Sequence, residues 1–591
     1  MAKKHEDKSI SKVSDDKALE TTQGSRTDIV KVRGARSLFL DHWQWWAAAI
    51  ILVILGAFPV TRYAILGPFI KSNVTITVDD SQMGTSVSKA TVTIDGKSVE
   101  TNATGQAKIS SNVGFRTLTV TKQYYKTFST SELVSLGQNT IAIKLVPLGR
   151  LVSLTVTNKI TGQPVAGVEI KVLDTSATSG TNGVANIVLP PSPSTQKATL
   201  SGNGYNSATA QIQVVTQKVS ANTIAVTPSG KIYFLSNLSG NIDVAKTNLD
   251  GTDRQVVLAG TGNENQNTTS LLASRDWKYL ALLARRNSGD EDPSLYVIDT
   301  SNDSVSTMDT GNASFQSIGW AGDRFIYQVN KTSTDGSTSS STQELKSYDP
   351  ATKSITVLVQ ATTYAEGLGE CCNEASQGQA LYGAYIINGQ VMYVEGWTEH
   401  NYGDPDSLSL AGKQNTVNLV DADGSNATVV HAFSLNPLIR YGNYGPTYSS
   451  QPYDEPNSIY VGFGEYGQAP TYYVYENGQW GPDTDGTDPT SGSYLTYLLS
   501  PSGNKTLWTK YADGQNTPFT GAASANNAQI VSSATGYSAY GWFTDNYILV
   551  SQNSSSLYIM KSDGSGKPFK ITNYYKSDIS YNGYGGGYGG Q

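Results

Sequence analysis

Hydrophobic and polar residues alternate over many short runs of this chain. From Asn73 the runs include NVTITVDD, RTLTVTK and NTIAIKLVPL, and a later one is SATAQIQVV. Strict alternation places the apolar side chains on one face of a β-strand, and residues that favour turns separate the runs. Ile94-Asp95-Gly96-Lys97 is one such turn, because Asp-Gly supplies the positive φ angles that a tight hairpin requires. The pattern predicts a mainly β protein.

One segment departs from this alternation. WQWWAAAIILVILGAFPV, from Trp43 to Val60, is almost wholly apolar, and the run extends to Ile70 with few interruptions. A helix needs about 20 such residues to cross the hydrocarbon of a bilayer, and the Trp residues at its start suit a membrane interface. We predict a single transmembrane helix within residues 43–70. The alternative is a buried core helix, but no other helical pattern is present to bury it.

Basic residues set the expected orientation of this helix. Lys31, Arg33 and Arg36 precede the apolar run, so the positive-inside rule places residues 1–42 in the cytoplasm, although further basic residues lie just beyond the other end. The long charged lead favours an uncleaved signal anchor, since no A-x-A-like cleavage site follows. Residues 1–42 lack apolar periodicity and are expected to be disordered. The bulk of the chain is therefore predicted to be extracytoplasmic, attached to the cell membrane by one helix.

Two small β-domains are predicted next, at residues 72–147 and 148–217. TGQPVAGVEIKVLDT, GTNGVANIVLP and SGNGYNSATAQIQV in the second domain resemble the carboxypeptidase regulatory-like sandwich. ATVTIDGKSV, TNATGQAKI and VTKQYYKTF in the first domain are similar and approach the related PEGA domain. The resemblance implies two Ig-like β-sandwiches that serve as stalk modules and carry no catalytic site. Neither segment offers a His, a Cys or a convergent pair of acids.

A longer repeat occupies residues 221–575. GNIDVAKTNLDGTDRQVVL, NTVNLVDADGSNATVVH and SLYIMKSDGSGKPFKIT each run from an alternating strand through Asp-Gly-Ser/Thr into a second strand. A different hairpin lies upstream of each, as in TIAVTPSGKIYFLSN (223–237). Two hairpins in about 50 residues are the signature of one blade of a β-propeller. Asp563-Gly564 is thus predicted to be a hairpin turn and not a metal loop, because the copies share no further set of oxygen ligands.

The two series of hairpins interleave along the chain and predict about seven blades. The second hairpins are expected to turn at Asp250-Gly251, Asn302-Asp303, Pro350-Ala351, Asp423-Gly424, Asn477-Gly478, Asp513-Gly514 and Asp563-Gly564. The repeat resembles the TolB-type, WD40-like propeller repeat, from which SPSGNKTLWTK departs by carrying Ser502 where the family has Asp. The resemblance implies a propeller.

Charge and motifs argue against several functions. The formal net charge of -7 argues against nucleic acid as a partner, because phosphate binding needs a basic face. The chain has four His, and it contains no G-x-S-x-G elbow, P-loop or H-E-x-x-H motif. It also lacks room for the hydrolase domain that accompanies propellers in prolyl-oligopeptidase-like enzymes. We therefore expect no catalytic activity, while paired carboxylates that meet only in the fold stay as an alternative.

The two cysteines are adjacent, Cys371 and Cys372. Outside the cell they could form a vicinal disulfide; the alternatives are two free thiols or a bridge to another chain. Acidic loops recur at 288–294, 402–408 and 481–492. The last holds Asp483, Asp485 and Asp488 at spacings that could gather oxygens around calcium, but solvated turns are the simpler interpretation. No other cofactor is expected.

Tyrosine is concentrated in residues 439–480. The candidate ligand-binding residues are four that precede the fifth predicted blade, because a Tyr ring combines rigid apolar area with a hydroxyl group. They are Tyr441, Tyr444, Tyr448 and Tyr453. The alternative is that these rings only fill space between blades. Residues 576–591 are rich in Gly and Tyr and are expected to form a flexible tail.

Three long insertions separate the predicted strands of the propeller, at 361–380, 397–414 and 437–456. We expect them to be loops that cluster on one face, since links between blades and loops between a blade's middle strands emerge on the same side. The resulting hypothesis is a membrane-anchored surface protein that binds a protein or glycan. The alternatives are an envelope hydrolase with paired carboxylates in the propeller channel, or a structural component of an envelope complex.

Overall fold

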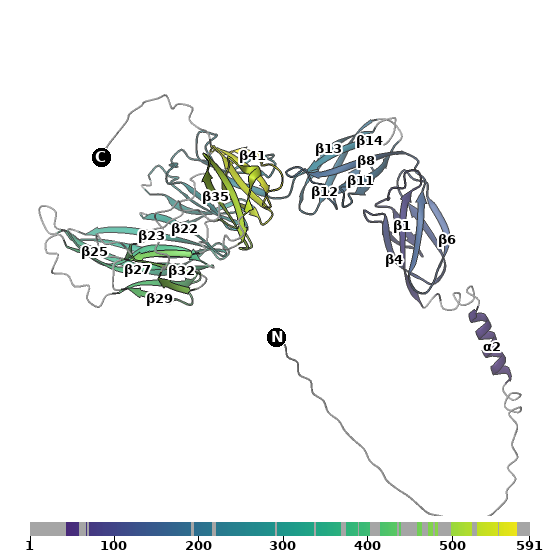
Figure 1. The fold of residues 1–591 in the computed structure, drawn as a ribbon, viewed down its shortest axis with the longest axis horizontal. Helices are drawn as coiled ribbons and strands as arrows, with labels where there is room; N and C mark the ends of the chain where they lie inside the picture. Colours follow the sequence, from purple (N-terminus) through teal and green to yellow (C-terminus); the bar gives the residue numbers. More distant parts are fainter. Residues whose placement is uncertain are drawn as a thin grey trace, which may run out of the picture.

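The computed structural model confirms a mainly β protein (Figure 1). It describes residues 43–57, 67, 70–190, 194–214, 220–289, 292–311, 313–335, 338–367, 374–387, 389–401, 414–433, 437–438, 458–463, 471–476, 479–482, 498–522, 529–553 and 555–575. The predicted disordered segment 1–42 and the tail 576–591 lie outside the described residues.

The apolar segment near the N-terminus contains helix α2, Trp43–Ala57. No Asp, Glu, Lys or Arg interrupts this helix, which agrees with the apolar run seen in the sequence. Within the described part of the chain, no helix has both the length and the hydropathy needed to span a bilayer.

The first β-domain consists of two sheets, with strand orders β4-β1-β7 and β3-β2-β5-β6. Its strands are β1 Lys71–Asp80, β2 Thr91–Ile94, β3 Lys97–Glu100, β4 Gln106–Asn112, β5 Gly114–Thr121, β6 Phe128–Val134 and β7 Asn139–Leu145. Alternate residues of β1 (Val74, Ile76 and Val78) are fully buried in one core together with side chains from the second sheet. The alternation in the sequence therefore reports the inner faces of two stacked sheets.

The second β-domain repeats this topology, with strand orders β11-β8-β14 and β10-β9-β12-β13. Its strands are β8 Arg150–Asn158, β9 Glu169–Val172, β10 Thr175–Thr178, β11 Val184–Leu189, β12 Ser194–Gly202, β13 Tyr205–Val214 and β14 Ser220–Val226. β1 and β8 occupy the same place, because each pairs antiparallel with one neighbour and parallel with the last strand of its domain.

β14 corrects one prediction. The hairpin expected at residues 223–237 is wrong, because β14 pairs in parallel with β8, and the next strand pairs with its successor along the chain. The physical reason is burial. Ile224 and Val226 complete the apolar core of the second β-domain, so these residues belong to that domain and not to the repeats that follow.

The remaining described residues form antiparallel sheets in which most strands pair with their sequence neighbours. The first two sheets contain β15 Lys231–Ser236, β16 Asp243–Asn248, β17 Gln255–Leu258, β18 Ser270–Ala273, β19 Tyr279–Ala284, β20 Ser294–Asp299 and β21 Ser304–Asp309. An eight-stranded sheet follows, with β22 Ser314–Ala321, β23 Arg324–Asp335, β24 Thr338–Asp349, β25 Ser354–Gly367, β26 Glu374–Ile387, β27 Gln390–Asn401, β28 Asn415–Asp421 and β29 Thr428–Phe433.

Three four-stranded sheets complete the described chain. They contain β30 Pro437–Leu438, β31 Ser458–Phe463, β32 Thr471–Glu476, β33 Gln479–Pro482, β34 Leu498–Leu499, β35 Lys505–Ala512, β36 Gln515–Ala522, β37 Gln529–Ile530, β38 Ser538–Thr544, β39 Tyr547–Gln552, β40 Ser556–Lys561 and β41 Phe569–Asn573, with the short helix η1 Ser532–Ala534 after β37.

The Asp-Gly turns lie where the repeat predicts them, with one exception. Asp563-Gly564 connects β40 to β41, and the Asp563 carboxylate accepts the Ser565 N–H at 2.8 Å, so this is a hairpin turn as expected. Asp513-Gly514, in contrast, connects β35 to β36, the two middle strands of its sheet. The prediction for the sixth repeat was therefore wrong, because an Asp-Gly pair specifies a tight turn but not which strands it connects.

Neighbouring sheets pack through equivalent strands. The Trp320 indole on β22 donates to the Leu272 carbonyl on β18 at 3.1 Å, and the Trp542 indole on β38 donates to the Leu498 carbonyl on β34 at 2.7 Å. In both cases the first strand of one sheet contacts the first strand of the preceding sheet. One apolar cluster joins the sheet β15–β17 both to the next sheet and to the last one, β38–β41.

Candidate recognition surface

The second β-domain contacts the turn side of the sheets, defined as the end that carries the Asp250-Gly251 and Asp545-Asn546 turns. Ile160, in the turn after β8, is buried in the cluster shared by the first and last sheets. The Lys159 ammonium lies 2.8 Å from Asp250, and the Asn158 amide donates to the Tyr547 hydroxyl at 3.0 Å. A single turn of the second β-domain therefore holds both the first and the last sheet.

Asp250 is the buried acid of this contact. Burial alone would raise the pKa of its carboxyl group, but hydrogen bonds from Lys159, Thr252 and Thr227 outweigh that effect and hold the pKa well below its usual range. The Thr227 hydroxyl donates at 2.7 Å. Asp250 is thus fully paired as an anion, and it attaches the second β-domain to the first sheet.

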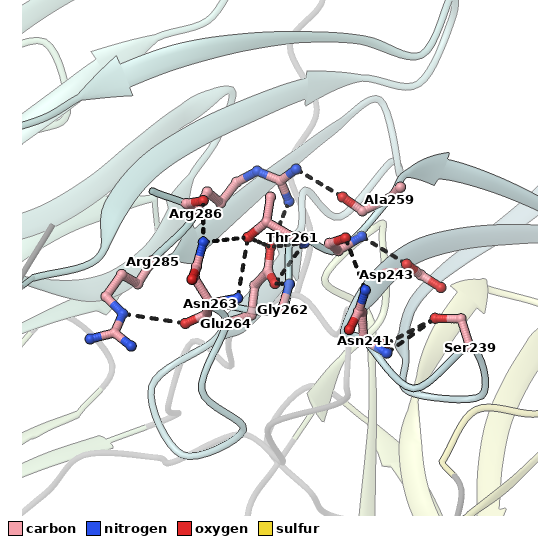
Figure 2. A network of polar contacts seen from close by, with 11 residues as sticks. Ser239, Asn241, Asp243, Ala259, Thr261, Gly262, Asn263, Glu264, Arg285 and Arg286 are labelled. Carbon is pink, nitrogen blue, oxygen red and sulfur yellow. Dashed lines mark hydrogen bonds and ion pairs between the residues drawn. The ribbon is translucent and has the colours of Figure 1, made fainter. Parts of the chain in front are cut away.

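The opposite end of the sheets, which we call the link side, carries the connections between sheets and the loops between middle strands. Figure 2 shows this side around residues 259–264, which follow β17. The Glu264 side chain is only 1% exposed and lies 3.0 Å from the Arg286 guanidinium, just after β19. It also accepts the N–H groups of Thr261 and Gly262, at 2.9 Å each. The carboxylate therefore orders its own loop and attaches it to the second sheet.

The same network reaches the loop between β15 and β16 (Figure 2). The Asn241 amide donates to the Gly260 carbonyl at 3.4 Å, and the Gly260 N–H donates to Asp243 at 2.7 Å. On the other side, the Asn263 amide donates to the Arg286 carbonyl at 3.0 Å. The link from the first sheet to the second thus lies between two loops, the one that connects β15 to β16 and the one that follows β19. In these two sheets, the link and the middle loops therefore lie at the same end.

The largest feature of the link side is an extension of β23–β27, which we call the β-arm (residues 331–335, 338–343, 361–367, 374–380 and 396–401). These strands are 12 or 14 residues long, whereas β18–β21 have four or six. At the end of this extension, neighbouring strands pair Asp335 with Thr338, Thr338 with Glu366, Glu366 with Ala375, and Ala375 with Asn401. The β23–β24 and β25–β26 connections and the end of β27 therefore lie at the same end of the sheet, whereas the β24–β25 and β26–β27 turns lie at the opposite end.

The β-arm contains the described parts of two predicted insertions. Residues 361–367, 374–380 and 397–401 lie side by side, which confirms that the first two insertions are adjacent. They are strands, however, and not the loops that we expected. The Ser- and Thr-rich sequences in this region lack apolar alternation, and they are strands because each pairs with its neighbours in the sheet.

Polar side chains hold the β-arm together. The Thr363 hydroxyl donates to the Gln379 carbonyl at 3.0 Å, and Gln343 accepts the Leu381 N–H at 2.7 Å. Tyr364 stands out among these small polar groups because it is 55% exposed. The β-arm therefore presents hydroxyl groups and an exposed aromatic ring, which suits recognition of a polar ligand.

A row of alternating charges fixes the base of the β-arm to the preceding sheet. Glu344 lies 2.8 Å from Lys331 and 3.1 Å from Lys346, and Lys346 lies 3.1 Å from Asp309 on β21. Burial would raise the pKa of Glu344, but the two lysines outweigh it and lower the pKa. Burial would likewise lower the pKa of Lys346, but the two acids raise it. Every charge in this row is paired, so it is a structural support for the β-arm.

Several predicted site residues cannot be compared with this geometry. Tyr441, Tyr444, Tyr448 and Tyr453 lie outside the described residues, as do Cys371, Cys372, Asp483, Asp485 and Asp488. Only the first two residues of the insertion at 437–456 are described. In the parts of the chain that the structure describes, no group of three or more His, Cys, Asp or Glu side chains could hold a metal ion.

The sequence interpretation missed Glu264, Arg286 and Tyr364. A signal existed for the first pair, since Arg285 and Arg286 directly follow the wholly apolar strand YLALLA. Two cations at the end of a buried strand favour an acid nearby, but the sequence does not single out Glu264, since Asp276 lies closer to the strand. Tyr364 carries no comparable signal, because its exposure follows from the length of the β-arm.

No protein-family model matches the chain, and no curated protein matches its sequence. Among solved structures, TolB from Acinetobacter baumannii is 10% identical, with a TM-score of 0.25, covering 61% of this chain and 78% of TolB. An acylaminoacyl peptidase is 10% identical, with a TM-score of 0.28, covering 52% of this chain and 46% of the peptidase. A shaft pilin SpaA from Lactobacillus rhamnosus GG is 14% identical, with a TM-score of 0.14, covering 27% of this chain. All three TM-scores lie below 0.5, so these similarities carry no argument about this chain.

Proposed function

We propose that this chain is a surface recognition protein, anchored in the cell membrane by a helix within residues 43–70 and displaying a β-propeller of about seven blades on two β-sandwiches. Its ligand is a protein or glycan outside the cell. The membrane part of the proposal rests on the apolar run from Trp43 to Val60. The formal net charge of -7 argues against a nucleic-acid ligand.

The propeller part rests on pairing and packing. Four-stranded antiparallel units follow one another along the chain, and β22–β29 contain two of them in succession. First strands of neighbouring sheets are linked through buried Trp320 and Trp542, as blades of one ring would be. The sheet β15–β17 shares one core with both the next and the last sheet, which is the contact that closes a ring.

One observation carries the recognition role: the stalk and the β-arm occupy opposite ends of the sheets. The stalk contacts the turn side through Lys159 and Asp250. The β-arm and the loop network around Glu264 lie on the link side. A membrane-attached stalk would therefore direct the link side outward, where a ligand is met first. Function commonly resides on connections carried by a rigid scaffold, and the link side fits that description.

Shortening the β-arm tests this assignment. Lys331 and Thr342 are cross-strand partners, so replacing residues 332–341 with Asn-Gly gives a tight hairpin without changing the register below it. Full-length protein and this variant would be applied to a glycan array and chemically cross-linked to intact cell envelopes. We expect the wild-type chain to capture a ligand and the variant and Tyr364→Ala to lose at least about tenfold in capture, equivalent to about 1.4 kcal/mol.

A matched control is Val256→Ser, an exposed apolar residue on β17 away from the β-arm. It should bind as the wild type does. Unchanged capture by the shortened variant, with unchanged melting temperature, would exclude the β-arm as the ligand site.

Protease treatment of intact cells tests the orientation. Protease should degrade residues 72–591 and leave residues 1–42 protected, because the positive-inside rule places the N-terminus in the cytoplasm. Degradation of residues 1–42 alone would reverse the topology.

A further inference from the structure

The first β-domain exposes large apolar side chains at one end. Phe115 is 56% exposed, Leu133 38% and Leu136 50%. Phe115 and Leu133 are cross-strand partners on β5 and β6, and Leu136 lies in the turn between β6 and β7. We call these three residues the basal patch. Farther along the same face of β5 the residues are Thr117, Thr119 and Thr121, so the apolar character is confined to the end of the sheet.

The basal patch surrounds the point at which the chain enters this domain from α2. The Val113 N–H donates to the Ile70 carbonyl at 3.0 Å, and the Ser72 hydroxyl donates to the Gly137 carbonyl at 2.6 Å. Val113 and Gly137 are close neighbours in sequence of Phe115 and Leu136. In Figure 1, α2 lies beyond this end of the domain, on the side away from the second β-domain. Residues 58–70 connect the two, and even a fully extended chain of that length reaches only about 45 Å.

Basic side chains accompany the basal patch. Lys71 begins β1 and Lys97 follows the Asp95-Gly96 turn at the same end, and both are exposed. Arg116 donates to the Val113 carbonyl at 2.8 Å and lies 3.6 Å from Asp95. Glu132 is opposite Arg116 on β6 and accepts the Thr130 hydroxyl at 3.4 Å. The acids thus have partners within the domain, whereas the two lysines sit at the rim of the apolar residues.

We propose that the basal patch rests on the lipid bilayer that holds the helix, with Phe115, Leu133 and Leu136 in the headgroup region and Lys71 and Lys97 facing phospholipid phosphates. The inference rests on the proposed membrane anchor. Apolar residues next to lysines are the composition that favours the membrane interface, and the connection to α2 makes this end of the domain the one nearest the helix. The contact orients the stalk, because it adds a second point of attachment beside the helix.

Lipid cross-linking tests the proposal on the full-length chain. The protein would be reconstituted into vesicles of phosphatidylcholine and phosphatidylglycerol that contain a phospholipid with a photoactivatable diazirine near its headgroup. Adducts would then be mapped by mass spectrometry. We expect adducts on residues 43–60 and also on peptides that contain Phe115 and Leu136.

Two multiple variants make the test specific. Phe115→Ser with Leu133→Ser and Leu136→Ser should lower the adducts on the domain at least fivefold and leave those on residues 43–60 unchanged. The matched control is Met83→Ser with Leu148→Ser, which removes exposed apolar residues at the far end of the domain and in the segment that leads to the second β-domain, and it should change nothing. Circular dichroism would establish that both variants melt as the wild type does.

The outcomes separate this inference from the membrane proposal. Adducts on residues 43–60 without adducts on the basal patch would overturn the inference and leave the anchor in place. Adducts at neither position would overturn the anchor and the inference with it. Equal adducts on the wild type and the triple variant, or cross-links between two protein copies through Leu136, would also overturn the inference.

Discussion

Lys122 lies at the contact between the two β-domains of the stalk. Its ammonium group donates to the Lys89 carbonyl at 3.0 Å and to the Ser176 carbonyl of the second domain. Burial lowers the pKa of this lysine to about 8, and the attraction of Glu100 and Glu169 does not offset it. A single side chain therefore makes the contact sensitive to mildly alkaline pH.

The sign of this sensitivity follows from proton linkage. Between pH 8 and about 10.5 the unfolded chain holds the Lys122 proton and the folded chain has lost it, so the free energy of unfolding rises with pH in this window. We expect the wild type to gain on the order of 1–2 kcal/mol relative to Lys122→Met between pH 7.5 and 10, after allowing for partial solvent screening. Urea unfolding at both pH values measures the difference. Lys108→Met, at an exposed position on β4, should show no such change; parallel behaviour of the Lys122 and Lys108 variants would contradict the assignment.

For single residues, the sequence predicts only interactions with partners that are close by in the chain. The Asp563-Gly564 turn was predictable because an Asp carboxylate and a Gly satisfy one turn by themselves. The hydrogen bonds of Trp320 and Trp542 were not, because each indole N–H donates to a carbonyl group of a different sheet. The pairing of Glu264 with Arg286 was predictable only in part, since two adjacent arginines indicate that an acid lies nearby but do not identify it.

At the scale of elements, the β-arm depends on close pairing of β25 with β26. Gly378 has a φ of +150°, and a Cβ atom there would lie 2.2 Å from the Thr362 carbonyl oxygen and 2.6 Å from the Thr363 Cα. Both contacts are with backbone, which cannot move aside without breaking the strand pair. Gly378 is thus the residue that lets the two long strands meet.

Gly378→Ala should therefore separate β25 from β26. We expect a loss of about 2–3 kcal/mol in stability and faster hydrogen exchange at residues 363–367 and 374–378. Gly481→Ala is the control, because nothing lies within 4 Å of a Cβ at that position. Unchanged exchange in the Gly378 variant would mean that the pairing is not limited by backbone approach.

Strand patterns told us which faces are buried but not which strand is the partner. The alternation in β14 is compatible both with a hairpin to β15 and with a place in the second β-domain. Its partner is determined by the apolar core that its buried side chains complete. The β-arm posed the opposite problem. Ser and Thr runs with no apolar face resemble loops, and only pairing with neighbouring strands makes them a sheet.

At the scale of the whole molecule, the stalk stabilises the contact between the first and last sheets. A closed ring of blades leaves only short strand edges, so residues 221–575 would be expected to fold as a unit by themselves. Ile160, however, is buried among side chains of both sheets, and it belongs to the second β-domain. The sheets should therefore be less stable without that domain than with it.

Ile160→Asp in the full-length chain tests this dependence, because it places an unpaired charge in an apolar cluster. We expect a loss of about 3 kcal/mol and faster hydrogen exchange in β15–β17 and β38–β41, while β22–β25 are unaffected. Leu173→Asp, at an exposed position of the same domain, should be neutral. A fragment of residues 227–575 should likewise melt several degrees below one of residues 150–575; equal melting would show that the sheets need no stalk.

The contact of residues 158–160 with both the first and the last sheet also affects how the molecule responds to mechanical tension. The covalent connection from β14 leads only to β15, so a pull along the backbone alone would peel the first sheet away from the last. Lys159 binds the turn of the first sheet, and Asn158 binds Tyr547 on the last sheet, at 2.8 and 3.0 Å. A load applied between the β-arm and the stalk is therefore shared by both sheets and acts across their strands in shear. If the sheets form the proposed propeller, this contact would resist tension best in the direction in which the proposed ligand would pull.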